Sequence, residues 1–165
     1  MRSVAALTLA LGSMLAVPYV APAAASGKPR LDGTERAIVR AVNRQRSAHG
    51  LGRLDAGRRL SRAADHHSWE MLAGDYFAHA SRNGSPFERR VRRYGDYRAV
   101  GETLARVSRC GRGSARRVVS MWMGSSGHRA ILLSSRFRRI GVGKRTGRLG
   151  SGRACLVTAD LASRR

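Results

Sequence analysis

Lysine, acidic residues and aromatic residues are all scarce in this 165-residue chain, although its formal net charge is +22. Only Lys28 and Lys144 among the 32 basic residues are lysine, so nearly all of the positive charge is arginine, spread along the whole chain. Charge of this kind attracts polyanions without selecting among them. Because aromatic residues that could stack on bases make up only 5% of the chain, we expect no specific nucleic-acid partner.

No apolar run reaches the ~20 residues that a membrane-spanning helix needs. The longest run, 4–17, follows a single arginine and precedes three alanines at 23–25, a pattern typical of a secretory leader and its cleavage site. The alternative is an uncleaved anchor. We expect a secreted, extracellular monomer with no transmembrane segment in the mature chain, divided into a signal peptide (1–25), a linker (26–33) and one domain (34–163).

Cysteine is limited to Cys110 and Cys155, which lie 45 residues apart. A secreted chain meets an oxidising compartment, so a disulfide between them is expected. Closing a loop of this length stabilises a fold by about 4 kcal/mol in the chain-entropy model. Two free buried thiols or metal ligation are the alternatives, but no cysteine pair has the close spacing typical of a structural zinc site.

Helical and strand patterns alternate along the chain and predict an α+β domain with an antiparallel sheet. The capping residues Asp32 or Thr34 begin the first helix, and Ser85 followed by Pro86 predicts a serine cap with proline at the first helical position. The expected helices are 34–49, 57–73, 85–95 and one after Gly113, followed by a short helical turn at 127–133. The expected strands lie within 97–107, around 140–142 and at 155–161, and a hairpin turn at 147–152 joins the last two.

Three separated residues are candidates for chemistry: His79 in a polar break, Glu102 within an apolar strand, and His128 at the start of a short helix. A carboxylate in such a strand is costly to bury without a partner, which would be one of the many arginines, a histidine or a metal. His67 lies on the apolar stripe of its helix and is expected at the edge of the core. His66 and His49 are expected on the surface.

Several segments resemble the bacterial branch of the CAP superfamily, the SCP-like domain of cysteine-rich secretory, antigen 5 and pathogenesis-related proteins. The resemblance covers about 34–161 and rests on motifs that occur in the family's order: Asn43–Arg46 with Gly50, Leu51 and Leu54; Tyr76–His79; Gly101–Thr103; Trp122 to Leu132; and Phe137–Gly143.

The resemblance implies a three-layer α-β-α sandwich with a central antiparallel sheet and a cleft that holds a tetrad of two histidines and two glutamates. His79 and His128 would be the metal ligands, for zinc or another divalent metal, weakly bound. Glu102 would be a further ligand or would orient the histidines or a metal-bound water, and it would be the catalytic residue. The second glutamate that some relatives have after the tryptophan has no counterpart in 123–125, which predicts a reduced site.

The sequence leaves three functions open, and whether the protein is an enzyme stays undecided. The favoured one is a binding module of the cell envelope or extracellular space, for an anionic cell-wall polymer, a lipid or an extracellular protein. The second is a metal-assisted hydrolase of protease or esterase type that uses the same cleft; no serine or cysteine nucleophile with an adjacent base is evident, and Ser81 and Ser126 are the candidates. The third is a polyanion binder that acts through arginine alone.

Overall fold

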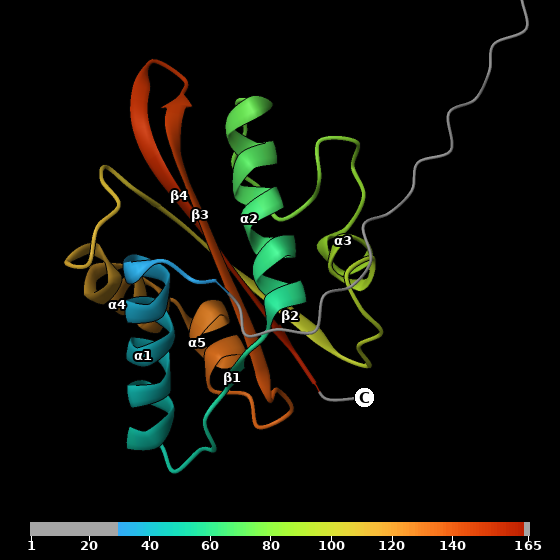
Figure 1. Ribbon diagram of the computed structural model, residues 1–165, viewed down its shortest axis with the longest axis vertical. Coiled ribbons are helices and arrows are strands. Elements are labelled where there is room, and N and C mark those ends of the chain that lie inside the picture. Colours follow the sequence, from blue (N-terminus) through green and yellow to red (C-terminus); the bar gives the residue numbers. More distant parts are fainter. Residues whose placement is uncertain (1–29, 164–165) are drawn as a thin grey trace, which may run out of the picture.

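The computed structural model describes residues 30–163 (Figure 1). The expected signal peptide, 1–25, and most of the expected linker lie outside this part of the chain. The elements follow in the order α1 (Gly33–Ala48), β1 (Asp55–Ala56), α2 (Arg58–Ala73), α3 (Phe87–Arg92), β2 (Val100–Val107), α4 (Ser114–Gly124), α5 (Ser126–Leu132), β3 (Arg139–Leu149) and β4 (Gly152–Ala162). None of the helices within 30–163 is long and apolar enough to cross a membrane.

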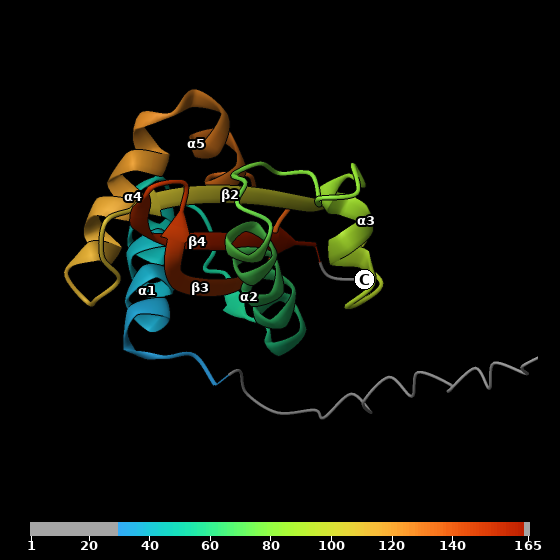
Figure 2. The same cartoon turned by 90° about the horizontal axis from the view of Figure 1, so that it is seen from above.

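The four strands form one sheet in the order β1-β3-β4-β2. Helices α2 and α3 lie on one side of it and α1, α4 and α5 on the other, as Figures 1 and 2 show. The three-layer α-β-α sandwich is therefore confirmed. The sheet is antiparallel except at β1, which pairs in parallel with β3 over two residues. A strand this short has no alternation that a sequence pattern could reveal.

The main core fills the space between the sheet and the α1, α4 and α5 layer. Buried side chains of α1, including Ile38 and Val42, meet Trp122 of α4, which is 1% exposed. The indole nitrogen of Trp122 donates a hydrogen bond of 2.8 Å to the carbonyl of Leu104, so the ring is held against β2 at both its apolar and its polar end. This packing fixes the position of β2, the strand that carries Glu102.

Helix α2 lies directly on β3 because two glycines leave room for its backbone. A Cβ atom added at Gly141 would stand 2.1 Å from the carbonyl carbon of Leu60, and one at Gly143 would stand 2.1 Å from the amide nitrogen of Asp65. No side chain tolerates such distances. The close approach holds α2 over β3 and β4, and Met71 near the end of the helix packs in one cluster with Leu104 of β2.

Two local predictions differ from the structure. Pro86, and not Ser85, is the N-cap of α3, with extended backbone angles (φ −65°, ψ 152°), so the first helical residue is Phe87 and not Pro86. Ser85 instead donates its backbone N–H to Asn83. The turn predicted at 147–152 is confined to Gly150 and Ser151, because the β3–β4 ladder continues to the pair Leu149–Gly152.

The predicted disulfide between Cys110 and Cys155 is confirmed, with a Cα–Cα distance of 5.6 Å. It joins the loop after β2 to β4. The predicted cap at Asp32 is also confirmed: its side chain accepts hydrogen bonds from the Thr34 and Glu35 amides, and Glu35 reaches back to the Asp32 amide.

Candidate functional site

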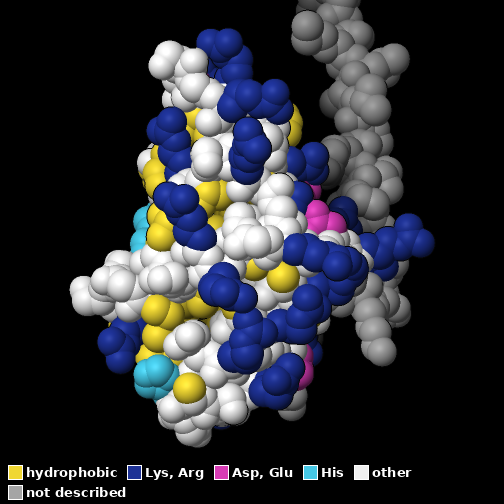
Figure 3. All heavy atoms as spheres, turned by 90° about the vertical axis from the view of Figure 1, so that its left-hand side faces the viewer, with side chains coloured by type: hydrophobic (Ala, Val, Ile, Leu, Met, Phe, Trp, Pro, Cys, Tyr) yellow, Lys and Arg dark blue, Asp and Glu magenta, His cyan; other side chains and the backbone are white. Residues whose placement is uncertain are grey.

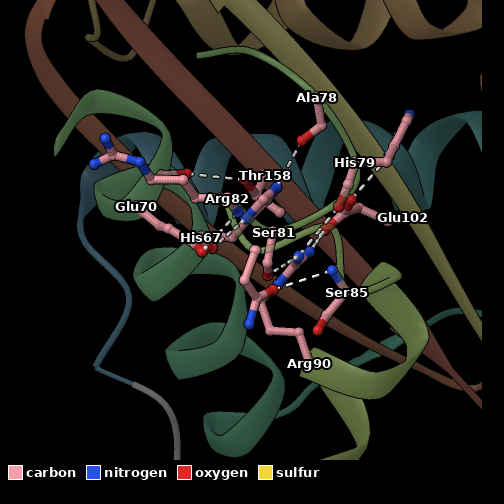
Figure 4. Close-up of polar contacts among 12 residues, drawn as sticks. His67, Glu70, Ala78, His79, Ser81, Arg82, Ser85, Arg90, Glu102 and Thr158 are labelled. Carbon is pink, nitrogen blue, oxygen red and sulfur yellow. Dashed lines mark hydrogen bonds and ion pairs between the residues drawn. The ribbon is translucent and has the colours of Figure 1, made fainter. Parts of the chain in front are cut away.

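Glu102 is the centre of a buried hydrogen-bond chain that ends at His79. The Glu102 side chain on β2 has no exposed surface. One of its oxygens, Oε1, lies 2.8 Å from Nδ1 of His79, and the other, Oε2, pairs with the guanidinium of Arg90 on α3 (Figure 4). The sequence offered an arginine or a histidine as the partner of this carboxylate, and the structure provides both.

Arg90 also fixes the loop that carries His79. Its Nη1 donates to the carbonyl oxygen of His79 at 3.1 Å and to Oγ of Ser81 at 3.4 Å, while the residue itself is only 4% exposed. Figure 4 shows the guanidinium between the loop and the Glu102 carboxylate. The Arg90–Glu102 ion pair thus holds both the backbone and the ring of His79. Because the pair is buried away from water, its hydrogen bonds are electrostatically stronger than they would be in solvent.

His128 faces His79 from the other helical layer. The two ring centroids are 6.2 Å apart and the ring planes make an angle of 49°. Helix α5, which begins two residues before His128, lies beside the edge strand β2 (Figure 2), so the two histidines meet at this edge of the sheet. Burial, and to a smaller extent the neighbouring His79, lowers the pKa of His128, which favours the neutral imidazole.

Asp160 on β4 is a site residue that sequence analysis missed. It is directly opposite Glu102 in the sheet register and is completely buried. Burial, together with the negative charge of Glu102, raises the pKa of Asp160 well above its ordinary value, which favours the neutral acid. The signal was present: like Glu102, Asp160 is an acid within an otherwise apolar strand.

A second polar cluster anchors the start of the His79 loop to α2. His67 is fully buried, with Nε2 at 2.9 Å from the carbonyl oxygen of Ala78 and Nδ1 at 3.1 Å from Oε2 of Glu70. The other Glu70 oxygen accepts from the backbone N–H of Arg82. Burial lowers the pKa of His67 despite the nearby carboxylates. The site therefore contains two imidazoles, His79 and His128, with His67 behind them as a support.

The donor set for a metal is small. Among the residues that the structure describes, no group of three or more His, Cys, Asp or Glu side chains is arranged to hold a metal ion. Both oxygens of Glu102 already have partners, whereas the His79 side chain is 48% exposed and has its Nε2 free of the contact to Glu102. His66 and His49, predicted on the surface, are exposed and contribute nothing to this site.

Similarity to known proteins agrees with this architecture. The model of the cysteine-rich secretory protein family, CAP, matches residues 39–158. An uncharacterized protein of Bacillus subtilis, YkwD, is 36% identical over 111 residues, which are 66% of this chain and 41% of that protein. The membrane protein YlbC of the same organism, also uncharacterized, is 32% identical over 67% of this chain and 31% of its own length. The chain thus spans less than half the length of these two curated relatives.

Solved structures show the same fold. An extracellular protein with an SCP domain from Bacillus anthracis superposes with a TM-score of 0.65 at 25% identity, over 80% of this chain and 41% of that one. An outer surface protein from Borrelia burgdorferi superposes with a TM-score of 0.67 at 17% identity, over 82% and 97% of the two chains. With the family match over 39–158 and the Bacillus relatives, these results show that the chain belongs to the cysteine-rich secretory protein (CAP) family.

Proposed function

We propose that this chain is a secreted binding module whose site takes one divalent metal ion, zinc by preference, through the imidazoles of His79 and His128. The partner of the module would be an anionic cell-wall polymer, a lipid or an extracellular protein. The observation that carries the metal proposal is the pair of facing rings, 6.2 Å apart, with Nδ1 of His79 turned toward Glu102.

The chemistry of these residues fits zinc. A zinc-bound histidine needs a neutral imidazole, about 2.0–2.1 Å from the metal, and usually donates its other ring N–H to a carboxylate or carbonyl. Glu102 accepts from Nδ1 of His79 in this way, and the lowered pKa of His128 keeps its ring neutral. A bound zinc ion would supply positive charge and water positions that a ligand oxygen could take.

Glu102 acts in this proposal as the group that orients His79, and not as a direct ligand. Its second oxygen is engaged by Arg90, which leaves the metal two protein ligands and otherwise water. Two ligands give weak binding, because structural zinc sites use four and catalytic sites three.

The hydrogen bonding of Ser81, which lies in the same loop as His79, favours a binding function over hydrolysis. Ser81 accepts a hydrogen bond from Arg90, a cation that cannot remove its proton. Glu102, which would be the general base of a hydrolase, is paired on both oxygens. A serine nucleophile needs an adjacent base, and here the nearest contact is of the wrong kind.

The test is a calorimetric titration of zinc into the full chain and into three single variants: His79→Ala, His128→Ala and the control His66→Ala. We expect one zinc per chain in the wild type and the control, and at least a tenfold weaker affinity in the other two. Glu102→Gln should weaken binding by about 10- to 100-fold, the usual effect of removing such an orienting carboxylate. Indistinguishable titrations for all three histidine variants would contradict the proposal.

A further inference from the structure

The positive charge is distributed unevenly over the molecule. The segment 103–159, which includes α4, α5 and β3, contains no aspartate or glutamate but has arginines throughout. Helix α4 therefore has no acid that could pair with its arginines internally. In α1 the one acid, Glu35, is used at the N-terminus in the capping box with Asp32.

Helix α1 presents a row of arginines to solvent. Arg36, Arg40 and Arg44 are exposed at intervals of four residues, while Ile38 and Val42 on the opposite side are fully buried. Residues four apart in a helix are separated by about 6 Å along its axis, so the guanidinium groups form a regular line. Arg36 donates one N–H to the carbonyl of Leu31. Within 30–163, Arg40 and Arg44 have no ion pair or hydrogen bond from their side chains.

Helix α4, beside α1, adds further exposed arginines to this surface. It packs against α1, and its Arg116 and Arg117 are exposed. Arg112, just before α4, lies across the start of α1, since a Cβ atom at Gly33 would be 3.2 Å from its Nε. We call the surface made by these side chains the α1/α4 face: Arg36, Arg40, Arg44, Arg112, Arg116 and Arg117. Figure 3 shows this side of the molecule, with many dark blue side chains and magenta ones only toward its right-hand edge.

We propose that the α1/α4 face binds an extended polymer of phosphodiester groups that carries no bases. Guanidinium groups bind phosphate oxygens through paired N–H donors, and a row of them suits an anion that repeats along a chain. Nucleic acid is less suited, because single strands are held partly by stacking on aromatic rings. The exposed aromatic side chains of the described part, Trp69 and Phe77, belong to α2 and the loop after it, in the other layer.

The test compares two fourfold variants that remove the same charge from different surfaces. R40Q/R44Q/R116Q/R117Q removes four of the six arginines of the α1/α4 face, and R59Q/R62Q/R89Q/R153Q removes four exposed arginines from α2, α3 and β4. Binding to a fluorescent poly(glycerol phosphate) and to an oligothymidylate with the same number of phosphates is measured by anisotropy against salt concentration. Circular dichroism checks that both variants fold.

We expect poly(glycerol phosphate) to bind the wild type and the second variant alike. The first variant should lose on the order of 100-fold in affinity at 0.1 M salt, and its salt slope should decrease by about 3, from 0.7 per lost contact. Equal losses in the two variants, or a salt slope near zero in the wild type, would show that no such face exists. Tighter binding of the oligothymidylate would overturn the choice of partner.

This proposal does not rest on the metal site. The α1/α4 face shares no residue with His79 and His128, so His79→Ala should bind the polymer as the wild type does, without added zinc. A failure of the zinc titration and a failure of the polymer titration are therefore separate results.

Discussion

Replacing Arg90 with methionine should destabilise the fold strongly, although the new side chain is apolar and of comparable length. Arg90 is 4% exposed and is paired with Glu102, whose side chain has no exposed surface. Removing one partner of a buried ion pair leaves an uncompensated charge and costs about 3–5 kcal/mol. The neighbour across the sheet, Asp160, is a second acid and supplies no positive charge to replace the guanidinium.

The expected loss corresponds to a fall in melting temperature of about 10–20 °C for a domain of this size. Urea unfolding followed by tryptophan fluorescence gives the free energy directly, and Trp122, buried beside β2, is a suitable probe. The matched variant is R90M/E102Q, in which the carboxylate is neutralised as well. It should recover part of the stability lost in Arg90→Met, since the orphaned charge is gone.

Two results would refute this reasoning. If Arg90→Met lowers the free energy of unfolding by less than about 1 kcal/mol, the Arg90–Glu102 pair contributes no more than an exposed ion pair does. The buried hydrogen bonds would then not be what holds Glu102 in place. A double variant whose loss equals the sum of the two single losses would show that Arg90 and Glu102 do not interact energetically.

Three further outcomes are expected. Reducing the Cys110–Cys155 disulfide should lower the free energy of unfolding by about 4 kcal/mol, measured by urea titration with and without reductant; no change would contradict the entropic estimate for a 45-residue loop. Gly141→Ala should lower the free energy of unfolding, measured by urea titration, by about 1–3 kcal/mol or more, because the new Cβ forces α2 off the sheet. Gly52→Ala, where nothing lies within 4 Å, should lower it far less. Equal losses in the two variants would refute the close-packing argument. Because the folded-state pKa of His67 is lowered, the unfolded chain binds more protons below its ordinary pKa of 6.5, so stability should fall as the pH drops below 6.5. His67→Gln should flatten this dependence, and an unchanged pH profile would assign the acid sensitivity to other groups.

Local patterns predicted most of the secondary structure because their causes are local. The apolar stripe of α2 and the capping box at Asp32 depend on neighbours within one or two helical turns, and both occur as expected. The errors have local causes too. Strand β1 is too short for a pattern, and proline at position 86 suits either the cap or the first turn.

The site could be predicted only in part. The carboxylate in the strand at Glu102 was a visible anomaly, and the family motifs indicated its two histidines. Arg90 gave no signal, because it is one of many arginines and its burial depends on the packing of α3 against β2. Asp160 did give the same signal as Glu102. Its position opposite Glu102, however, follows from the sheet register, which the sequence does not specify.

The central claim is that His79 and His128 hold one metal ion between them. Crystals of the full chain grown with zinc and measured on both sides of the zinc absorption edge test it most directly. We expect a single strong anomalous peak about 2.0–2.1 Å from one ring nitrogen of each histidine. A map with no peak between the two rings, or with zinc bound only at other side chains, would contradict it.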